Sequence, residues 1–175
     1  MLALVALLDL ELQQLDVKIA FLHGDLDEEI YMEQPEGFVQ HRNEKFVCRL
    51  KKSLYGLKQS PRQWYKKFDS FMLSQKYVRS EYDHCVYFKQ LKNGIFIILV
   101  LYVDDMLLAS KRIEEINRLK AQMARTFDMK DLGAARHIFG MDIFRDGSNG
   151  KLWLSQQKYI EKILFEIWDR VSDVQ

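Results

Sequence analysis

The strongest constraint on the fold is an apolar run of nine residues, 95–103, that ends abruptly at Asp104 and Asp105. A run of this kind is typical of a central strand that is buried on both faces of a sheet. The apolar pattern resumes at residues 106–109, so the two aspartates are expected in a tight turn between strands. Burying an unpaired carboxylate costs several kcal/mol, so the turn must lie where the charges are solvated or bound to a cation. Adjacent aspartates are also common in ordinary hairpin turns, and this pair alone does not establish a metal site.

A third aspartate strengthens the case for a metal site. Asp16 follows a predicted strand at residues 10–15 and so ends another apolar run with a carboxylate. If its strand neighbours the strand that ends at Asp104, the three carboxylates form a pocket made only of oxygen ligands. Such a pocket suits Mg²⁺, which binds carboxylates, water and substrate phosphates. Two Mg²⁺ ions about 3.5–4 Å apart would serve phosphoryl transfer, one activating a 3′-hydroxyl and the other neutralising the leaving pyrophosphate.

The periodicity of the chain predicts a single α+β domain. Strands are expected at residues 10–17, 46–50, 86–88, 95–102, 138–144 and 152–154. Helices are expected at residues 1–8, from Ser60 onward, at residues 113–127 and after Ser155. Ser60 is predicted to cap its helix, with Pro61 in the first helical position. Because strands and helices interleave without the regular alternation of a parallel fold, an antiparallel sheet backed by helices is favoured.

Charge and cysteine usage narrow the class of protein. Residues 24–40 hold six carboxylates and no Lys or Arg, whereas residues 42–67 hold nine basic residues and one acid. The basic segment could line a phosphate backbone, although a solvated surface is the ordinary interpretation of such a run. Cys48 and Cys85 lie far apart, which fits reduced thiols in an intracellular protein, cytoplasmic or nuclear. The apolar residues 1–8 are too short to span a bilayer and are predicted to form a buried helix rather than a signal or anchor.

Six sequence segments are distinctive. They are LDVKIAFLHG (15–24), IYMEQPEGF (30–38), SLYGLKQSPRQWY (53–65), LYVDDML (101–107), MKDLG (129–133) and LSQQKYI (154–160). In this order they resemble the motifs of copia-type LTR retrotransposon reverse transcriptases, over roughly residues 1–164. The resemblance implies a ferredoxin-like polymerase palm, in which an antiparallel sheet is backed by helices.

The resemblance also implies an activity and its metal ligands. Asp16 and Asp104 match the principal metal ligands of the family, and Asp105 matches its third carboxylate. The implied cofactor is a pair of Mg²⁺ or Mn²⁺ ions. The implied reaction is nucleotidyl transfer from a dNTP onto a primer 3′-hydroxyl, with RNA or DNA template-primer as the partner.

Further roles follow from the resemblance. Three residues match positions beside the incoming nucleotide: Phe21 as an aromatic gate against a ribose 2′-hydroxyl, Gln59, and Lys130 as a proton donor to pyrophosphate. Three others match primer or template contacts: Tyr102, Val103 and Arg62. A place in the core is the alternative for Phe21, with the gate favoured, and an exposed lysine at 130 is ordinary. The histidines show no ligand spacing and are expected at the surface or in the hydrogen-bonded core: His23, His41, His84 and His137.

The sequence departs from the family pattern in three places. Ile19 stands where the family usually has threonine, which would alter packing behind Asp16. The family's fingers would precede residues 1–8 and are expected to be missing. Residues 165–175 no longer resemble the family and are predicted to be a divergent tail after a truncated palm at residues 1–164. An incomplete copy of this kind is expected to have little polymerase activity and to self-associate through the surfaces where fingers and thumb dock.

Two other functions are compatible with the sequence. A non-catalytic nucleic-acid-binding module would place aromatic residues on its central strands to stack bases. This chain instead places carboxylates at strand ends, which repel phosphate unless a metal intervenes, so the enzyme is favoured. An inert remnant or a co-opted interaction protein has the same fold, because function depends on the complete site.

Overall fold

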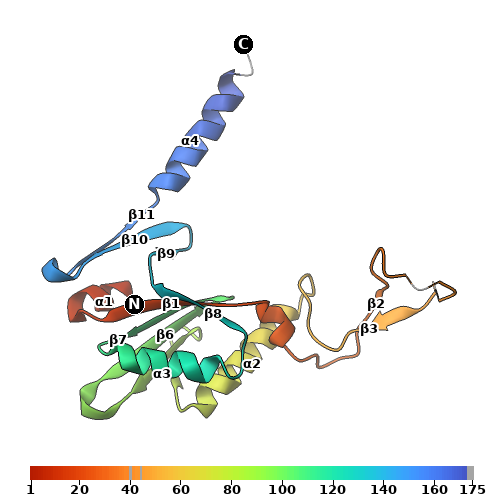
Figure 1. The fold of residues 1–175 in the computed structure, drawn as a ribbon, viewed down its shortest axis with the longest axis horizontal. Coiled ribbons are helices and arrows are strands. Elements are labelled where there is room, and N and C mark those ends of the chain that lie inside the picture. Colours follow the sequence, from red (N-terminus) through yellow and green to blue (C-terminus); the bar gives the residue numbers. More distant parts are fainter. Residues whose placement is uncertain (40, 44, 173–175) are drawn as a thin grey trace.

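The computed structural model describes residues 1–39, 41–43 and 45–172. Its centre is a six-stranded antiparallel sheet with the strand order β4-β5-β6-β7-β1-β8 (Figure 1). In that order the strands are Val78–Arg79, Val86–Gln90, Phe96–Tyr102, Asp105–Ser110, Glu11–Val17 and Met129–Ala134. Two smaller sheets pair β2 with β3 and β10 with both β9 and β11. Their strands are Tyr31–Glu33, Val47–Arg49, His137–Ile138, Met141–Asp146 and Lys151–Ser155. The predicted α+β class with an antiparallel sheet backed by helices is therefore confirmed.

Two helices cover one face of the large sheet. They are α2 (Ser60–Ser74) and α3 (Ile113–Met123). Trp64 and Phe68 recur at four-residue spacing, which places them on one side of α2, and both are buried against the sheet. Ile116 of α3 joins the same core. These aromatic side chains of α2 therefore belong to the core.

A second core lies on the opposite face of the sheet. Leu12 of β1 and Leu107 of β7 pack there with Val5 of α1 (Leu2–Leu8). Successive side chains of a strand point to opposite faces, so Asp16 lies on the same face as Leu12. The alternate residues of β1, such as Leu15, point to the other face of the sheet, toward α2 and α3. This alternation decides which side chains meet at the site described below.

Two parts of the chain extend away from the large sheet in Figure 1: the β2–β3 hairpin and α4 (Gln157–Ser172). The α4 helix exposes six large apolar side chains: Tyr159, Ile160, Leu164, Phe165, Ile167 and Trp168. The hydroxyl of Ser155 accepts a hydrogen bond from the backbone of Gln157, the first residue of α4, at 3.2 Å, and the helix begins after Ser155 as expected. None of the helices in the described part of the chain is long and apolar enough to cross a membrane.

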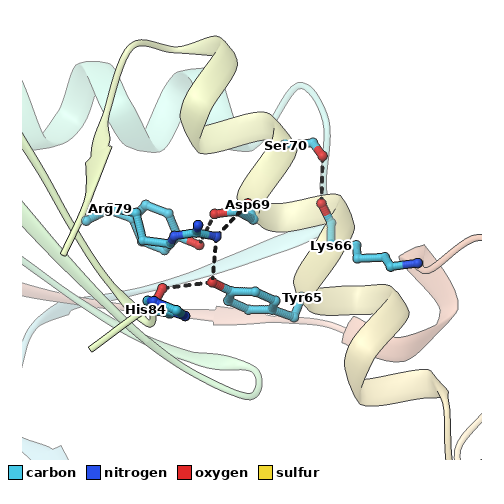
Figure 2. A network of polar contacts seen from close by, with 7 residues as sticks. Tyr65, Lys66, Asp69, Ser70, Arg79 and His84 are labelled. Carbon is cyan, nitrogen blue, oxygen red and sulfur yellow. Dashed lines mark hydrogen bonds and ion pairs between the residues drawn. The ribbon is translucent and has the colours of Figure 1, made fainter. Parts of the chain in front are cut away.

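A polar network fixes α2 to the β4–β5 edge of the sheet (Figure 2). Asp69 accepts hydrogen bonds from the Tyr87 hydroxyl at 2.9 Å and from Arg79 at 3.2 Å. The Tyr65 hydroxyl donates to the carbonyl oxygen of His84 at 3.0 Å. Burial raises the pKa of the Tyr87 phenol, so this hydroxyl stays protonated and remains a donor. The network orients α2 on the sheet, and with it the residues that α2 presents to the site.

Several local predictions need correction. The strand buried on both faces is β7, whereas β6 alternates buried and half-buried side chains because only its α2–α3 face is fully covered. Ser60 is the first residue of α2 rather than its cap, and its hydroxyl donates to the carbonyl of Leu54 at 2.5 Å. The helix α1 exists, but Val5 is its one buried residue. The strand predicted at residues 138–144 is split, because Phe139 and Gly140 both adopt positive φ between β9 and β10.

Gly24 lies tightly against the backbone of α2. A Cβ atom at this position would lie 2.9 Å from the Cβ of Gln63 and 3.0 Å from the backbone nitrogen of Trp64. We expect Gly24→Ala to lower the free energy of unfolding by about 1–3 kcal/mol, because the backbone of α2 cannot move aside cheaply. Urea denaturation measures the change. The control is Gly147→Ala, whose Cβ would meet Asp9 at an ordinary 3.6 Å. Equal losses in the two variants would contradict the steric explanation.

Candidate active site

The pairing of β1 with β7 brings two of the three predicted aspartates together. Asp16 of β1 lies directly opposite Asp105 of β7. Side chains of directly opposed residues in antiparallel strands project on the same face, with Cβ atoms roughly 4.5–5.5 Å apart. The amide of Gln14, two residues before Asp16 and on the same face, donates to the carboxylate of Asp105 at 3.3 Å. Gln14 was not predicted as a site residue, although its position two residues before Asp16 in a strand indicates that both side chains lie on the same face.

Asp104 occupies the turn that joins β6 to β7. Its carbonyl oxygen accepts a hydrogen bond from the backbone of Val17 at 2.9 Å, which ties the turn to the end of β1. The preceding residue, Val103, adopts a positive φ of 56°, an uncommon conformation for a β-branched residue. The indole nitrogen of Trp64 donates to the Val103 carbonyl at 2.6 Å. The strained turn is thus held from both sides, by β1 and by the core of α2.

The pKa of Asp16 responds to the neighbouring charges. Partial burial and the negative charges of Asp104 and Asp105 raise the pKa of Asp16, while Lys130 and Lys18 act in the opposite direction. Lys130 is the residue of β8 directly opposite Asp16. The predicted nucleotide-binding lysine therefore lies beside the aspartates, on the other flank of β1.

The donor set fits a divalent cation in its chemistry. All three carboxylates offer hard oxygen ligands. Their negative charges repel one another, and a bound divalent cation would neutralise them. Across the residues that the structure describes, no three His, Cys, Asp or Glu side chains are grouped closely enough to hold a metal by themselves. Mg²⁺ commonly takes one or two carboxylates and completes its shell with water and substrate phosphates. The residues fit an ion that is held weakly until substrate arrives.

Three other predicted site residues have local contacts of their own. Phe21 belongs to the short helix η1 (Ala20–His23) that directly follows β1, and its ring lies 4.5 Å from that of Tyr55. Gln59 immediately precedes α2, and the half-buried Gln59 backbone accepts from Gln63 at 3.0 Å. Tyr102 is exposed at the end of β6 with its ring 4.4 Å from Phe139.

The acidic and basic segments pair with each other. Within them, Lys52 and Lys67 bind Asp25, the latter at 2.7 Å, and Lys66 binds Asp27 at 2.7 Å. These lysines lower the pKa of both carboxyls. Arg62, exposed on α2, contributes to the same effect at Asp27. Much of the basic segment is therefore engaged within the chain, which favours the surface interpretation over a continuous phosphate track.

Two histidines are engaged in hydrogen bonds, as predicted. His137 binds Asp142 at 2.8 Å, and the ring of His23 accepts from the backbone of Asp128 at 3.4 Å. The ring of His23 also packs against Trp64. In the described part of the chain, neither histidine forms a hydrogen bond with Asp16, Asp104 or Asp105.

The six motifs resemble those of a reverse transcriptase, and a match to a family model agrees with that resemblance. A family model described as "Reverse transcriptase (RNA-dependent DNA polymerase)" matches residues 1–169, and the chain belongs to this family. The predicted resemblance to the copia-type members is confirmed.

Relatives in plants and yeast are similar over most of the chain. A retrovirus-related Pol polyprotein from transposon TNT 1-94 of Nicotiana tabacum is 61% identical over 93% of this chain. A putative transposon Ty5-1 protein of Saccharomyces cerevisiae is 38% identical over 87% of it, and the Pol polyprotein from transposon RE1 of Arabidopsis thaliana is 35% identical over 87%. The chain spans 12%, 49% and 10% of these relatives' own lengths. No solved structure matches.

Proposed function

We propose that this chain is the palm of a retrotransposon reverse transcriptase, over residues 1–164, and transfers nucleotides from dNTPs onto a primer 3′-hydroxyl, at the low rate that its sequence predicts. The observation that carries the proposal is the gathering of Asp16, Asp104 and Asp105 between β1 and the β6–β7 turn, with Lys130 alongside. Structural proteins have little reason to crowd three carboxylates, because the repulsion costs stability. Family membership supports the same activity.

Each residue of the proposed site has a separate role in this reaction. Asp16 and Asp104 are the ligands for two Mg²⁺ or Mn²⁺ ions, and Gln14 holds Asp105 in a fixed orientation through its amide. When bound, these ions supply charge neutralisation of the triphosphate and activation of the 3′-hydroxyl. Lys130, on the flank of Asp16, is placed to give a proton to the leaving pyrophosphate.

The nucleic acid contacts follow from the exposed residues around the turn. Tyr102 and Val103 are 58% and 44% exposed at the end of the β6–β7 hairpin, where they form a platform for the primer terminus. Gln59 and Arg62, at the start of α2, are the contacts for the incoming nucleotide and the template. The partners are an RNA or DNA template-primer and a dNTP.

Phe21 is proposed to exclude ribonucleotides by steric contact with the 2′-hydroxyl. Its ring is only partly buried and is braced by Tyr55, so it presents a fixed flat surface five residues beyond Asp16. We expect Phe21→Val to increase the use of rNTPs relative to dNTPs by about 10- to 100-fold, because a smaller side chain leaves room for the hydroxyl. Competing single-nucleotide incorporation measures the ratio. Tyr55→Leu, which loses the brace and keeps the gate, is expected to shift the ratio less. An unchanged ratio in Phe21→Val would assign this residue to the core.

Primer extension tests the proposed function directly. Purified chain is incubated with an RNA template, a labelled DNA primer, dNTPs and Mg²⁺, with parallel reactions that contain EDTA or omit the template. Extension that requires both template and metal supports the polymerase. Binding of the template-primer without any extension, at every Mg²⁺ and Mn²⁺ concentration, would instead support a non-catalytic nucleic-acid-binding protein.

A further inference from the structure

The edge strand β8 contains an irregularity next to the aspartates. At the C-terminal end of β8, Ala134 pairs with Gln13 of β1, and Gly133 pairs with Gln14. The register then shifts by one residue, so that the next pairs are Asp131 with Leu15 and Lys130 with Asp16. Leu132 is the extra residue of this β-bulge. Gly133 adopts a φ of +72°, a conformation that bulges commonly use glycine to reach.

The bulge decides which charge faces Asp16. If the first register continued, Asp16 would pair with Asp131, and Lys130 would pair with Val17 on the face that α2 and α3 cover. A slip of one residue exchanges the two faces of a strand, and like charges directly opposite each other are destabilising. With the bulge, Lys130 points to the aspartate face and Asp131 points to the helix face. A single inserted residue thus replaces a repulsive pair by an attractive one.

On the face covered by α2 and α3, Asp131 forms an ion pair with a buried lysine. Lys120 of α3 is only 9% exposed, and its ammonium donates to Asp131 at 2.7 Å and to the side chain of Gln13 at 2.9 Å. The Asp131 carboxylate also accepts a hydrogen bond from the backbone of Gly133 at 2.9 Å, and this bond spans the extra residue of the bulge. Burial alone would raise the pKa of Asp131, but Lys120 and the Gly133 amide outweigh it and lower the pKa.

We propose that Lys120 is a positioning residue, which holds Asp131 on the helix face and so fixes the bulge that sets Lys130 beside Asp16. The buried ammonium joins β8 to β1 on both sides of the register shift, since Gln13 precedes the shift and Asp131 follows it. An unpaired ammonium in this place would be costly, so the bulged register is the one that satisfies it. The value of this placement for catalysis rests on the proposed function, whereas the control of register does not.

Disulfide trapping reads the register directly. In a background with Cys48 and Cys85 replaced by serine, Val17→Cys is combined with either Met129→Cys, its partner in the bulged register, or Lys130→Cys, its partner without the bulge. Only directly opposed residues bring their Cβ atoms within bonding range. The first pair is expected to crosslink and the second to remain reduced. Adding Lys120→Met is expected to raise crosslinking of the second pair relative to the first by about tenfold, since a charge-assisted hydrogen bond is lost.

A second variant and a second measurement separate the outcomes. Asp131→Asn removes the same ion pair from its more exposed side and is expected to shift the crosslinking in the same direction, which covers the case that Lys120→Met does not fold. Lys120→Arg, which keeps the charge, is expected to retain the parent pattern. Unchanged crosslinking in folded Lys120→Met or Asp131→Asn would overturn the proposal.

Primer extension then tests the catalytic consequence. Lys120→Met is expected to slow extension in the parent, but to add little to Lys130→Met, because both act through the same ammonium. Shifted crosslinking with fully additive losses would overturn the link from Lys120 to Lys130. If the crosslinking shifts and Lys130→Met itself has no effect, the assigned role of Lys130 fails while the control of register stands.

Discussion

Replacing Asp104 with asparagine is expected to lower the rate of primer extension by about a thousandfold or more, the scale on which loss of a preorganised electrostatic group acts. The amide keeps the shape of the side chain and loses its charge. Calorimetric titration of Mg²⁺ without nucleotide is expected to show weak binding to the parent, because few protein ligands are present, and none to the variant.

The same substitution is not expected to lower stability. A carboxyl whose folded-state pKa is raised stabilises the folded protein only when protonated, so Asp16 disfavours folding at neutral pH. Removing the charge of Asp104 relieves part of this repulsion. The free energy of unfolding of Asp104→Asn at neutral pH should therefore equal or exceed that of the parent.

The control is Glu114→Gln, the same change of carboxylate to amide at an exposed position of α3. It should keep the parent rate of extension. Equal rates for Asp104→Asn and the parent, or equal Mg²⁺ affinity, would remove Asp104 from the metal site.

The aspartate cluster was predictable because each of its members ends an apolar run, and that signal lies within single strands. The expected pairing was wrong in detail: β1 lies beside β7, which begins at Asp105, and not beside β6, the strand that ends before Asp104, so Asp16 faces Asp105 rather than Asp104. The bulge in β8 was not predictable in this way. Residues 129–134 contain adjacent opposite charges and a glycine instead of an alternating pattern, so no strand was expected there.

Long-range charge pairing was also beyond the sequence. The acidic and basic segments were treated as separate surfaces, but Lys67 and Asp25 meet because α2 packs against the turn that follows η1. Likewise, Ser60 and Pro61 correctly predicted the start of α2, while the partner of the serine hydroxyl depended on the preceding loop. Contacts of this kind depend on tertiary packing, which a local pattern does not contain.

Trp64 is expected to be the most costly single residue to truncate in the core near the site. It is 2% exposed and packs against Phe68 and Phe127 with ring centroids 5.5 and 5.3 Å away. Trp64→Ala is expected to lower the free energy of unfolding by about 3–5 kcal/mol, through lost burial and the cavity left behind. Thermal or urea unfolding followed by circular dichroism measures the loss. A loss below about 1 kcal/mol would mean that the core collapses around the gap.

A subtler variant separates packing from positioning. Trp64→Phe retains an aromatic ring but removes the indole donor that binds the Val103 carbonyl at 2.6 Å. Because Val103 holds a positive φ directly before Asp104, loss of this bond frees the turn to relax, and a displacement of about 1 Å can cost on the order of a hundredfold in rate. Phe68→Leu serves as the control, since it disturbs the same core without touching the turn. We expect Trp64→Phe to slow primer extension at least tenfold more than Phe68→Leu at matched stability. If the two variants slow extension equally, Trp64 supports the site only through the stability of the core, and the backbone of β1 alone holds the aspartate turn in place.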